Sequence, residues 1–198
     1  MLVVPDRYSY SYLLGVYLGD GHIGDTRRSY QFRVTLDAIY PGIVEEVVAA
    51  IQLMLPAGRV CIRDRPGWRV KIVDCTWKRW PEFFPQHGPG RKHERPIVLA
   101  GWQEAIVEAH PWELLRGLLH SDGCRTINGF DVKLPSGRVG HYEYPRWFFS
   151  NLSPDIRALF CRTCDRLGIR WTQSNHRNIS VSHRHSVALL EEAIGPKA

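Results

Sequence analysis

The order of apolar and polar residues predicts a run of alternating strands and helices in the first part of the chain. Residues 30–36 alternate between apolar and polar positions, which is typical of a half-buried strand. Residues 41–55 carry apolar residues at helical spacing behind a proline, and a Pro-Ala-Gly sequence ends that helix. Residues 59–65 and 68–74 predict a hairpin, and residues 77–84 predict a short helix.

The second part of the chain repeats this order. The expected elements are strands at 130–134 and 142–151, a helix over 153–168, strands at 169–174 and 178–183, and a last helix reaching about residue 192. A further short helix is expected over 102–109. Between the parts lies a segment rich in Gly, Pro and charge. The sequence therefore predicts a first half over 1–85, a linker over 86–101 and a second half over 102–198.

A nine-residue motif opens each half. Leu13 to Gly21 reads LLGVYLGDG, and Leu115 to Gly123 reads LRGLLHSDG. The small residues in each copy are four apart, at Gly15 and Gly19, and at Gly117 and Ser121. On a helix this spacing places both on one face, so that another backbone can approach closely. We expect the two motif helices to pack together about a pseudo-two-fold axis, with Gly21 and Gly123 as left-handed caps at their ends.

The aspartates of the two motifs then lie at the same end of the helix pair. Asp20 and Asp122 are each followed by the motif's last glycine. Two carboxylates at close range repel unless a cation lies between them, and helix C-termini do not favour negative charge. Oxygen ligands suit a hard divalent cation, so the motif predicts a site for Mg²⁺, for which Mn²⁺ can substitute.

With these two motifs the sequence resembles the LAGLIDADG homing endonucleases in their single-chain form, over nearly its whole length. The resemblance implies an α+β fold of two pseudo-symmetric αββαββα halves, packed through the motif helices, with a saddle-shaped antiparallel sheet lying on DNA. It implies Mg²⁺-dependent cleavage of both strands of a long asymmetric target across the minor groove. Asp20 and Asp122 would be the metal ligands, with help from the backbone carbonyls of Gly19 and Ser121.

The resemblance is incomplete at some positions. The family's first motif aspartate is replaced by Leu18 and His120. The family often has a basic residue near the active site at the end of the fourth strand of each half. Lys78 and Arg184 fall near that place, so both are expected to stabilise charge at the phosphate.

Charge and strand alternation predict a DNA-binding surface. The 198 residues carry a formal net charge of +6, and 21 of the 26 basic residues are arginine, which reads phosphate and guanine well. In the second strand of the hairpin, Val70 and Ile72 are expected to face inward and Arg69 and Lys71 outward. The expected DNA contacts are Arg27, Arg28, Gln31, Arg33, Arg63, Arg65, Arg69, Lys71, Lys133, Arg138, Arg146, Arg170, Gln173 and Arg177. The basic run at 91–95 is interpreted as part of a tether that makes weak phosphate contacts.

Other features exclude several classes of protein. Five irregularly spaced cysteines argue against a disulfide framework and for a reducing cytoplasm. Cys161 and Cys164 could belong to a zinc site with nearby histidines, but a core role is favoured because no second ligand pair has suitable spacing. No apolar run approaches a membrane span. The chain is expected to be a DNA-associated cytoplasmic monomer.

Two functions fit these observations. One is an active, site-specific DNA endonuclease, and the other is a DNA-binding regulator of the same fold that does not cleave. The presence of both Asp20 and Asp122 favours the enzyme. A regulator would usually add a helix-turn-helix domain, and no segment is left to form one.

Overall fold

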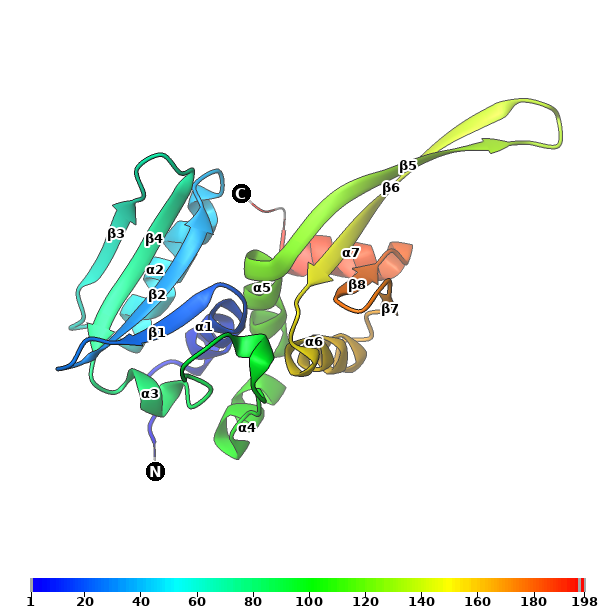
Figure 1. Ribbon diagram of the computed structural model, residues 1–198. Helices are drawn as coiled ribbons and strands as arrows, with labels where there is room; N and C mark the ends of the chain where they lie inside the picture. The colour runs from blue at the N-terminus through cyan, green and yellow to red at the C-terminus, as the bar shows by residue number, and fades with distance from the viewer. Residues whose placement is uncertain (1, 196, 198) are drawn as a thin grey trace.

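The first half contains two strand pairs between three helices (Figure 1). The computed structural model describes residues 2–195 and residue 197. The elements are α1 (Arg7–Gly19), β1 (Gly21–Asp25), β2 (Tyr30–Asp37), α2 (Pro41–Met54), β3 (Val60–Asp64), β4 (Val70–Trp77) and α3 (Trp80–Phe83). Local sequence explains where the helices begin. Asp6 caps α1 by accepting a hydrogen bond from the Ser9 amide at 2.6 Å, and a proline opens α2.

The second half repeats the same order after a connecting segment. A short 3₁₀ turn (Lys92–Glu94) and α4 (Gly101–Ala109) lead into it. Its elements are α5 (Pro111–Asp122), β5 (Gly123–Lys133), β6 (Val139–Ser150), α6 (Pro154–Arg166), β7 (Thr172–Gln173), β8 (Asn178–Val181) and α7 (Arg184–Ala193). The expected α+β fold of two αββαββα halves is confirmed.

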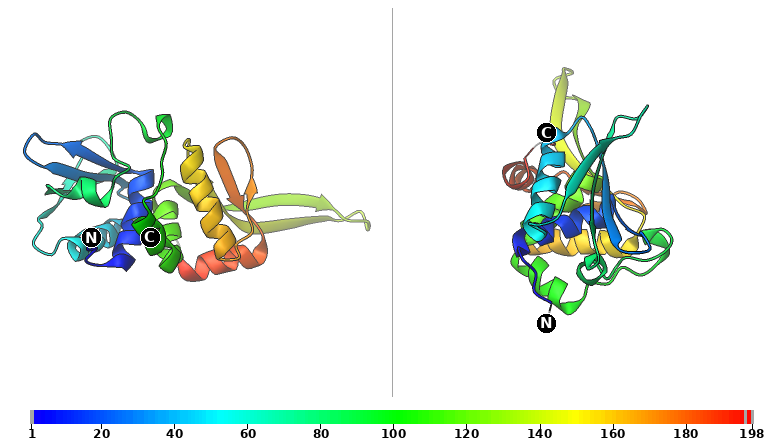
Figure 2. Two further views of the ribbon diagram at one scale, coloured as in Figure 1. Left: turned by 90° about the horizontal axis from the view of Figure 1, so that it is seen from below. Right: turned by 90° about the vertical axis from the view of Figure 1, so that its left-hand side faces the viewer.

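The motif helices α1 and α5 pack against each other at the centre of the molecule (Figures 1 and 2). A Cβ atom added to Gly117 would lie 2.1 Å from the carbonyl oxygen of Tyr12, and one added to Gly15 would lie 2.5 Å from that of Leu114. The predicted close approach is therefore present, and it depends on the absence of side chains at these two positions.

The motif's last glycines do not have the predicted conformation. Neither Gly21 nor Gly123 has a positive φ, and each is the first residue of a strand. A Cβ at Gly21 would lie 2.4 Å from Cα of Tyr17, and one at Gly123 would lie 2.4 Å from the carbonyl oxygen of Leu119. Glycine is required here because the strand turns back sharply against the helix, not because of a left-handed cap.

Each half has one antiparallel sheet, with the order β1-β2-β4-β3 in the first and β5-β6-β8-β7 in the second. Helix α2 lies behind the first sheet, and α6 and α7 lie behind the second (Figure 1). Phe32, Val34 and Leu36 face the core as predicted, and Phe149 stacks on Phe160 of α6 with ring centroids 4.3 Å apart. Each sheet therefore presents its other face away from the helices.

The predicted alternation of β4 is wrong by one residue. Val73 and Cys75 are buried, so Ile72, Asp74 and Thr76 face away from the core. Lys71 pairs with Leu36 across the strands, shares the core side, and forms an ion pair with Asp64 at 2.6 Å. The sequence alone does not decide which residues of β4 face the core, because Ile72 and Val73 are adjacent and both apolar.

Strands β5 and β6 extend far beyond the rest of the second sheet as a two-stranded arm (Figures 1 and 2). They pair from Gly123 with Phe149 to Lys133 with Val139, whereas β8 pairs only with residues 147–150 of β6. The sequence analysis predicted shorter strands here. In the described part of the chain, none of the helices combines the length and apolar character needed to cross a bilayer.

Candidate functional site

The two motif aspartates lie at the adjoining ends of α1 and α5. Asp20 is the C-terminal cap of α1, and Asp122 is the last residue of α5. A Cβ atom added to Gly19 would lie 3.2 Å from Cγ of Asp122 and 2.1 Å from Oγ of Ser121. The side chain of Ser121 donates to the carbonyl of Gly117 within its own helix, at 3.0 Å. Glycine at position 19 thus lets the two helix ends meet, which brings the carboxylates to one place.

Both carboxyl groups resist ionisation. Although Asp20 reaches solvent, the surrounding protein removes enough water to raise its pKa to about 6, and the charge of Asp122 adds to this rise. Burial also raises the pKa of Asp122. Lys92 and Lys197 act in the opposite direction on both groups. The negative charge of the pair is therefore only partly balanced by the protein.

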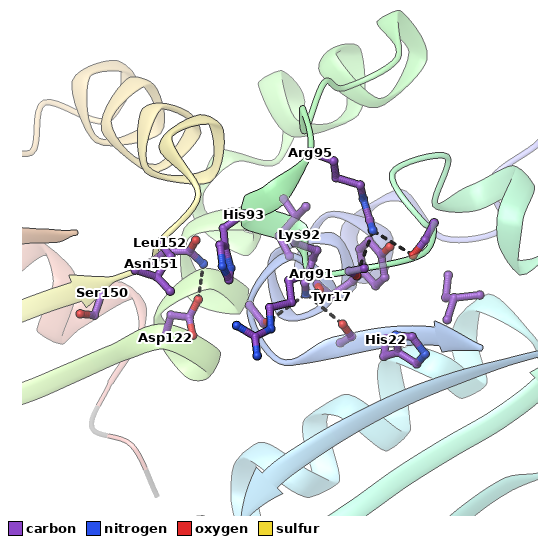
Figure 3. Close-up of a pocket in the computed structure, with 16 residues that line it drawn as sticks. Tyr17, His22, Arg91, Lys92, His93, Arg95, Asp122, Ser150, Asn151 and Leu152 are labelled. Atoms are coloured by element: carbon purple, nitrogen blue, oxygen red, sulfur yellow. Dashed lines mark hydrogen bonds between the residues drawn. The ribbon is translucent and has the colours of Figure 1, made fainter. Parts of the chain in front are cut away.

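Asn151 fixes the second of these aspartates. It follows β6, and its side-chain amide donates a hydrogen bond to Oδ2 of Asp122 at 2.6 Å (Figure 3). This hydrogen bond favours the ionised carboxylate, so it offsets part of the rise in the pKa of Asp122 that burial causes. The sequence analysis did not identify Asn151, because the contact joins residues 29 positions apart.

Lys92 projects from the linker onto the end of α1. Its ammonium group donates to the carbonyl oxygens of Tyr17, Gly19 and Gly21, at 2.7 Å for Gly19 and 2.9 Å for Gly21. It also lies 5.0 Å from the ring centroid of Tyr17. Burial lowers the pKa of Lys92 to about 8, while Asp122 and Asp20 favour its charged form.

Lys197, near the end of the chain, supplies a second cation. Its ammonium group donates to the carbonyl oxygen of His120 at 3.0 Å, and it lines a small cavity with Asp20 and Ser121. Lys92 follows Asp20 by 72 positions (92 − 20), and Lys197 follows Asp122 by 75 (197 − 122). With only five lysines in the chain, this similar spacing was the signal that sequence analysis missed.

The linker is held in place rather than being a loose tether. The guanidinium of Arg95 donates to the carbonyl oxygens of Gly88 and Pro89, each at 2.8 Å, and to that of Gln86 at 2.9 Å. The buried Gln86 side chain donates to Gln103 of α4 at 2.6 Å. The interpretation of residues 91–95 as a tether is therefore corrected: this segment forms one wall of the site.

A cavity of about 490 Å³ opens beside Asp122 (Figure 3), whereas Asp20 lines the smaller cavity that it shares with Lys197. The linker side chains Arg91, Lys92, His93 and Arg95 line one side, and Asp122 and Asn151 line the other. His22 of β1 and Ser150 of β6 come from the two sheets. The cavity thus joins the helix ends, both sheets and the linker, and most of its ionisable side chains are basic.

Lys78 and Arg184 are not brought to the aspartates, which corrects the sequence-based expectation. Lys78 follows Trp77, which pairs with Tyr30 at the start of β2. Asp20 lies near the other end of this strand, because Gly21 pairs with Val34. Arg184 begins α7 and follows the last residue of β8. The first residue of β8, Asn178, is the one that pairs near Asp122, with Ser150. The strands run away from the helix ends before reaching either residue. The cations that act on both aspartates are instead Lys92 and Lys197.

The residues at the helix ends fit a divalent cation of the Mg²⁺ type. Two carboxylates and the carbonyl oxygens of Gly19 and Ser121 are hard donors, and the Gly19 carbonyl keeps a lone pair beside its bond from Lys92. Among residues 2–195 and 197, no three Asp, Glu, His or Cys side chains group as ligands. Such a donor set leaves coordination positions for water and phosphate oxygens, as Mg²⁺ sites commonly do.

The outward face of the first sheet carries a network of predicted DNA contacts around a buried acid. Asp74, only 6 % exposed, accepts hydrogen bonds from Gln31 at 2.9 Å and from Arg63. Arg33 donates to Gln31 at 2.6 Å. Asp74 was not identified from the sequence. It orients these three side chains on the face that points away from the helices.

Three other predicted contacts of the first half lie in the turns that join its strands. Arg27 and Arg28 are exposed in the β1–β2 turn. Arg65 lies over the ring of Trp68 at 4.6 Å, in the β3–β4 turn. Arg69, by contrast, precedes β4 at the parity of Lys71, so the outward orientation predicted for it is also wrong, and it is paired with Asp37 at 3.2 Å.

The predicted contacts of the second half are more scattered. Arg146 is half-buried on the outward face of β6, over the ring of Phe148. Arg138 lies in the turn at the tip of the arm, and Arg170 and Arg177 are exposed in loops next to β7. Two residues have the opposite orientation. Lys133 shares the face of Asp131 and the buried Trp147, and Gln173 shares the face of the buried Ile179.

The cysteine pair of α6 has a structural position. Cys164 is fully buried in the core and Cys161 is partly buried. Burial raises the pKa of both thiols, as expected for cysteines that pack in the core.

Comparison with known proteins identifies the architecture. No protein-family profile matches the chain, and no curated protein sequence does. Solved structures do. The LAGLIDADG meganuclease I-AabMI bound to uncleaved DNA is similar with a TM-score of 0.55 and 13% identity, covering 95% of this chain and 82% of that one.

Two other solved structures are similar over comparable lengths. The homing endonuclease I-DmoI in complex with DNA and Mn has a TM-score of 0.56 and 13% identity, over 97% of this chain and 99% of that one. The I-LtrWI LAGLIDADG homing endonuclease bound to target DNA has a TM-score of 0.56 and 10% identity, over 94% and 81%. Together with the paired motif helices and the two sheets, these similarities show that the chain has the fold of the LAGLIDADG homing endonucleases, in the single-chain form with two motifs.

Proposed function

We propose that this protein is a divalent-metal-dependent endonuclease that cuts both strands of a specific DNA site. The observation that carries the proposal is the position of Asp20 and Asp122. They meet at the ends of two close-packed helices, between two sheets whose outward faces carry arginines. The structural neighbours include proteins bound to DNA and, for I-DmoI, to Mn or Ca ions. The proposal includes Mg²⁺ as the natural cation, a long asymmetric target, and a cytoplasmic monomer.

The side chains at the helix ends and around the cavity have distinct roles in this proposal. Asp20 and Asp122 would hold the cation, and Asn151 keeps the carboxylate of Asp122 oriented by its hydrogen bond. When bound, the cation would polarise the scissile phosphate and activate water. Lys92 holds a positive charge against the carbonyl oxygens of Gly19 and Gly21, and in this proposal it stabilises the negative charge that develops on the phosphate. The basic side of the cavity favours entry of the DNA backbone.

The first experiment selects cleaved sites from a random double-stranded DNA library in Mg²⁺. Wild-type protein should enrich one sequence and cut both of its strands. Asp20→Asn and Asp122→Asn should each abolish double-strand cleavage, because one cation ligand loses its charge. Binding to the enriched site in Ca²⁺ should stay within about tenfold, or ~1.4 kcal/mol.

A charge-matched control separates the site from general electrostatics. Glu45 is exposed on α2, behind the first sheet. Glu45→Gln removes the same unit of negative charge and should cut like wild type. Full cleavage by either aspartate variant would exclude the metal assignment. If a parallel selection for binding in Ca²⁺ enriches a site that wild type binds tightly but never cuts in Mg²⁺, the protein is a DNA-binding regulator instead.

A further inference from the structure

The outer part of the β5–β6 arm carries an exposed aromatic cluster. Phe130, Tyr142 and Tyr144 are 44%, 37% and 45% exposed, and their rings stack on one another. Ring centroids are 5.8 Å apart for Phe130 and Tyr144 and 6.0 Å apart for Phe130 and Tyr142. Exposed large apolar side chains that gather in this way mark a binding surface.

The cluster lies on the face of the arm that points away from the helices. Phe130 pairs with Tyr142, Asn128 with Tyr144 and Thr126 with Arg146, so these side chains share one face. The opposite face continues from Trp147, which is buried in the core. The aromatic cluster is therefore continuous with Arg146 on the outward face of the second sheet, which the proposed function places against DNA.

Charge distinguishes the two faces of the arm. The face opposite the cluster carries Asp131 and Glu143, and both lie within reach of His141, at 2.6 Å and 3.4 Å. Carboxylates repel the phosphate backbone. The aromatic face carries no acidic residue along this stretch. Its positions are Thr126, Asn128 and Phe130 on β5 and Tyr142, Tyr144 and Arg146 on β6. The opposite face also carries Arg125 and Lys133, but its carboxylates would lie against the phosphates, so the aromatic face is the better suited of the two to DNA.

The dimensions of the arm suit the major groove. Residues 139–146 of β6 pair with β5 alone, so this part is a two-stranded ribbon without a covering sheet. A two-stranded ribbon fits the major groove. The 11 residues of β5 span roughly 35 Å, which is about one turn of duplex DNA.

We infer that the aromatic cluster reads thymine methyl groups in the major groove, at the outer end of the half-site bound by the second sheet. The inference rests on the proposed DNA-binding function and names the chemistry that one part of it recognises. Phe130 has no hydrogen-bonding group, so it can distinguish bases only through apolar contact, and the thymine methyl is the apolar group that the major groove presents. The stacked rings restrain one another, which reduces the entropy lost on binding.

The test measures binding of the full chain to the enriched site in Ca²⁺, with thymines replaced one at a time by deoxyuridine. This replacement removes only the methyl group. Wild type should bind about fourfold more weakly for each methyl lost at one to three positions of the second half-site's outer end. Phe130→Ala should bind the thymine and deoxyuridine sites equally, within about twofold. Its base preferences in the other half-site should stay unchanged, which also shows that the variant is folded.

Two control variants keep the test specific. Tyr142→Phe keeps the ring and should retain the response to deoxyuridine. Val139→Ala trims an apolar side chain that is 66% exposed on the opposite face of the arm, and it should also retain the response.

Three results would overturn the inference. The first is that deoxyuridine has no effect in the outer second half-site, or the same effect in wild type and Phe130→Ala, although the first half-site is specific. The second is concentration-dependent dimerisation in sedimentation that Phe130→Ala abolishes, since the cluster would then bind a second copy. The third is that no sequence is enriched at all, which would overturn the proposed function together with this inference.

Discussion

At the helix ends, two aspartates that the motif makes equivalent have different surroundings. Asp122 accepts a hydrogen bond from Asn151, whereas Asp20 shares a small cavity with Asp37 and Lys197. The pKa of Asp20 is raised to about 6 by burial and by the charge of Asp122. Below that pH the carboxyl group holds a proton, which must leave before a cation can bind.

This difference predicts a pH-dependent stabilisation by metal without DNA. Because the folded-state pKa of Asp20 is raised, ionising it costs stability as the pH rises through about 6, and a bound cation removes that cost. Mg²⁺ at about 100 times its Kd should stabilise wild type by about 2.7 kcal/mol at pH 8, and this gain should be lost as the pH falls through about 6. Thermal unfolding with and without Mg²⁺ at several pH values measures it.

The matched variants make this measurement decisive. Asp20→Asn should show little gain from Mg²⁺ at any pH, while Glu45→Gln should behave like wild type. An equal gain at pH 5 and pH 8 in wild type would place the bound cation somewhere other than at Asp20.

Only some residues of the site could be predicted from the sequence. The repeated motif was sufficient to predict Asp20 and Asp122, since both lie within a short, recognisable pattern. Lys92, Lys197 and Asn151 reach the same site through contacts that join distant parts of the chain, and no local pattern marks them. The prediction for Lys78 and Arg184 depends on their position after the strands, and the direction of those strands places both residues away from the aspartates.

Among the elements, the contact between α1 and α5 holds the two halves together. The carbonyl oxygen of Tyr12 lies where a side chain at position 117 would begin, at 2.1 Å from the added Cβ. A backbone carbonyl cannot rotate away as a flexible side chain can. Even the smallest side chain must therefore move one helix relative to the other, which would also separate the aspartates at their ends.

The expected result is that Gly117→Ala destabilises the protein by about 3 kcal/mol and lowers the Tm by about 6–12 °C. Gly101→Ala is the matched control. Gly101 begins α4, has no atom within 4 Å of an added Cβ and has no positive φ, so alanine should leave the Tm nearly unchanged. Thermal unfolding followed by circular dichroism measures both. A Gly117→Ala protein as stable as wild type would show that the helices pack differently.

The elements were predictable in order but not in extent. Strong alternation located β2, and the proline and capping residues located α2 and α6. The arm was predicted too short because Gly129 and Pro145 interrupt the pattern, and because a ribbon exposed on both faces does not need a regular apolar alternation. In β4, the neighbouring apolar pair Ile72 and Val73 left the parity undecided until pairing with β2 fixed it.

At the scale of the whole molecule, the two sheets would meet DNA with different chemistry. The first presents Gln31, Arg33 and Arg63, oriented around Asp74, and the second presents the aromatic cluster and Arg146. The halves also differ in charge. Residues 1–98 carry 14 basic and 10 acidic side chains, for a net charge of +4, and residues 99–198 carry 12 and 10, for +2. Similar backbones with different surfaces predict two different half-sites in one asymmetric target.

Arg33→Ala tests this asymmetry. Arg33 is exposed on the outward face of β2, so its loss should relax base preference at one or two positions of one half-site, at a cost of about 1–3 kcal/mol if it contacts guanine. Each lost phosphate contact should instead reduce the log–log salt slope by about 0.9. Arg162→Ala is the control, because Arg162 is exposed on α6, behind the second sheet. It should change neither specificity nor salt slope. A palindromic enriched site, or an Arg33→Ala effect equal in both half-sites, would require a symmetric dimer on DNA and contradict the single-chain arrangement.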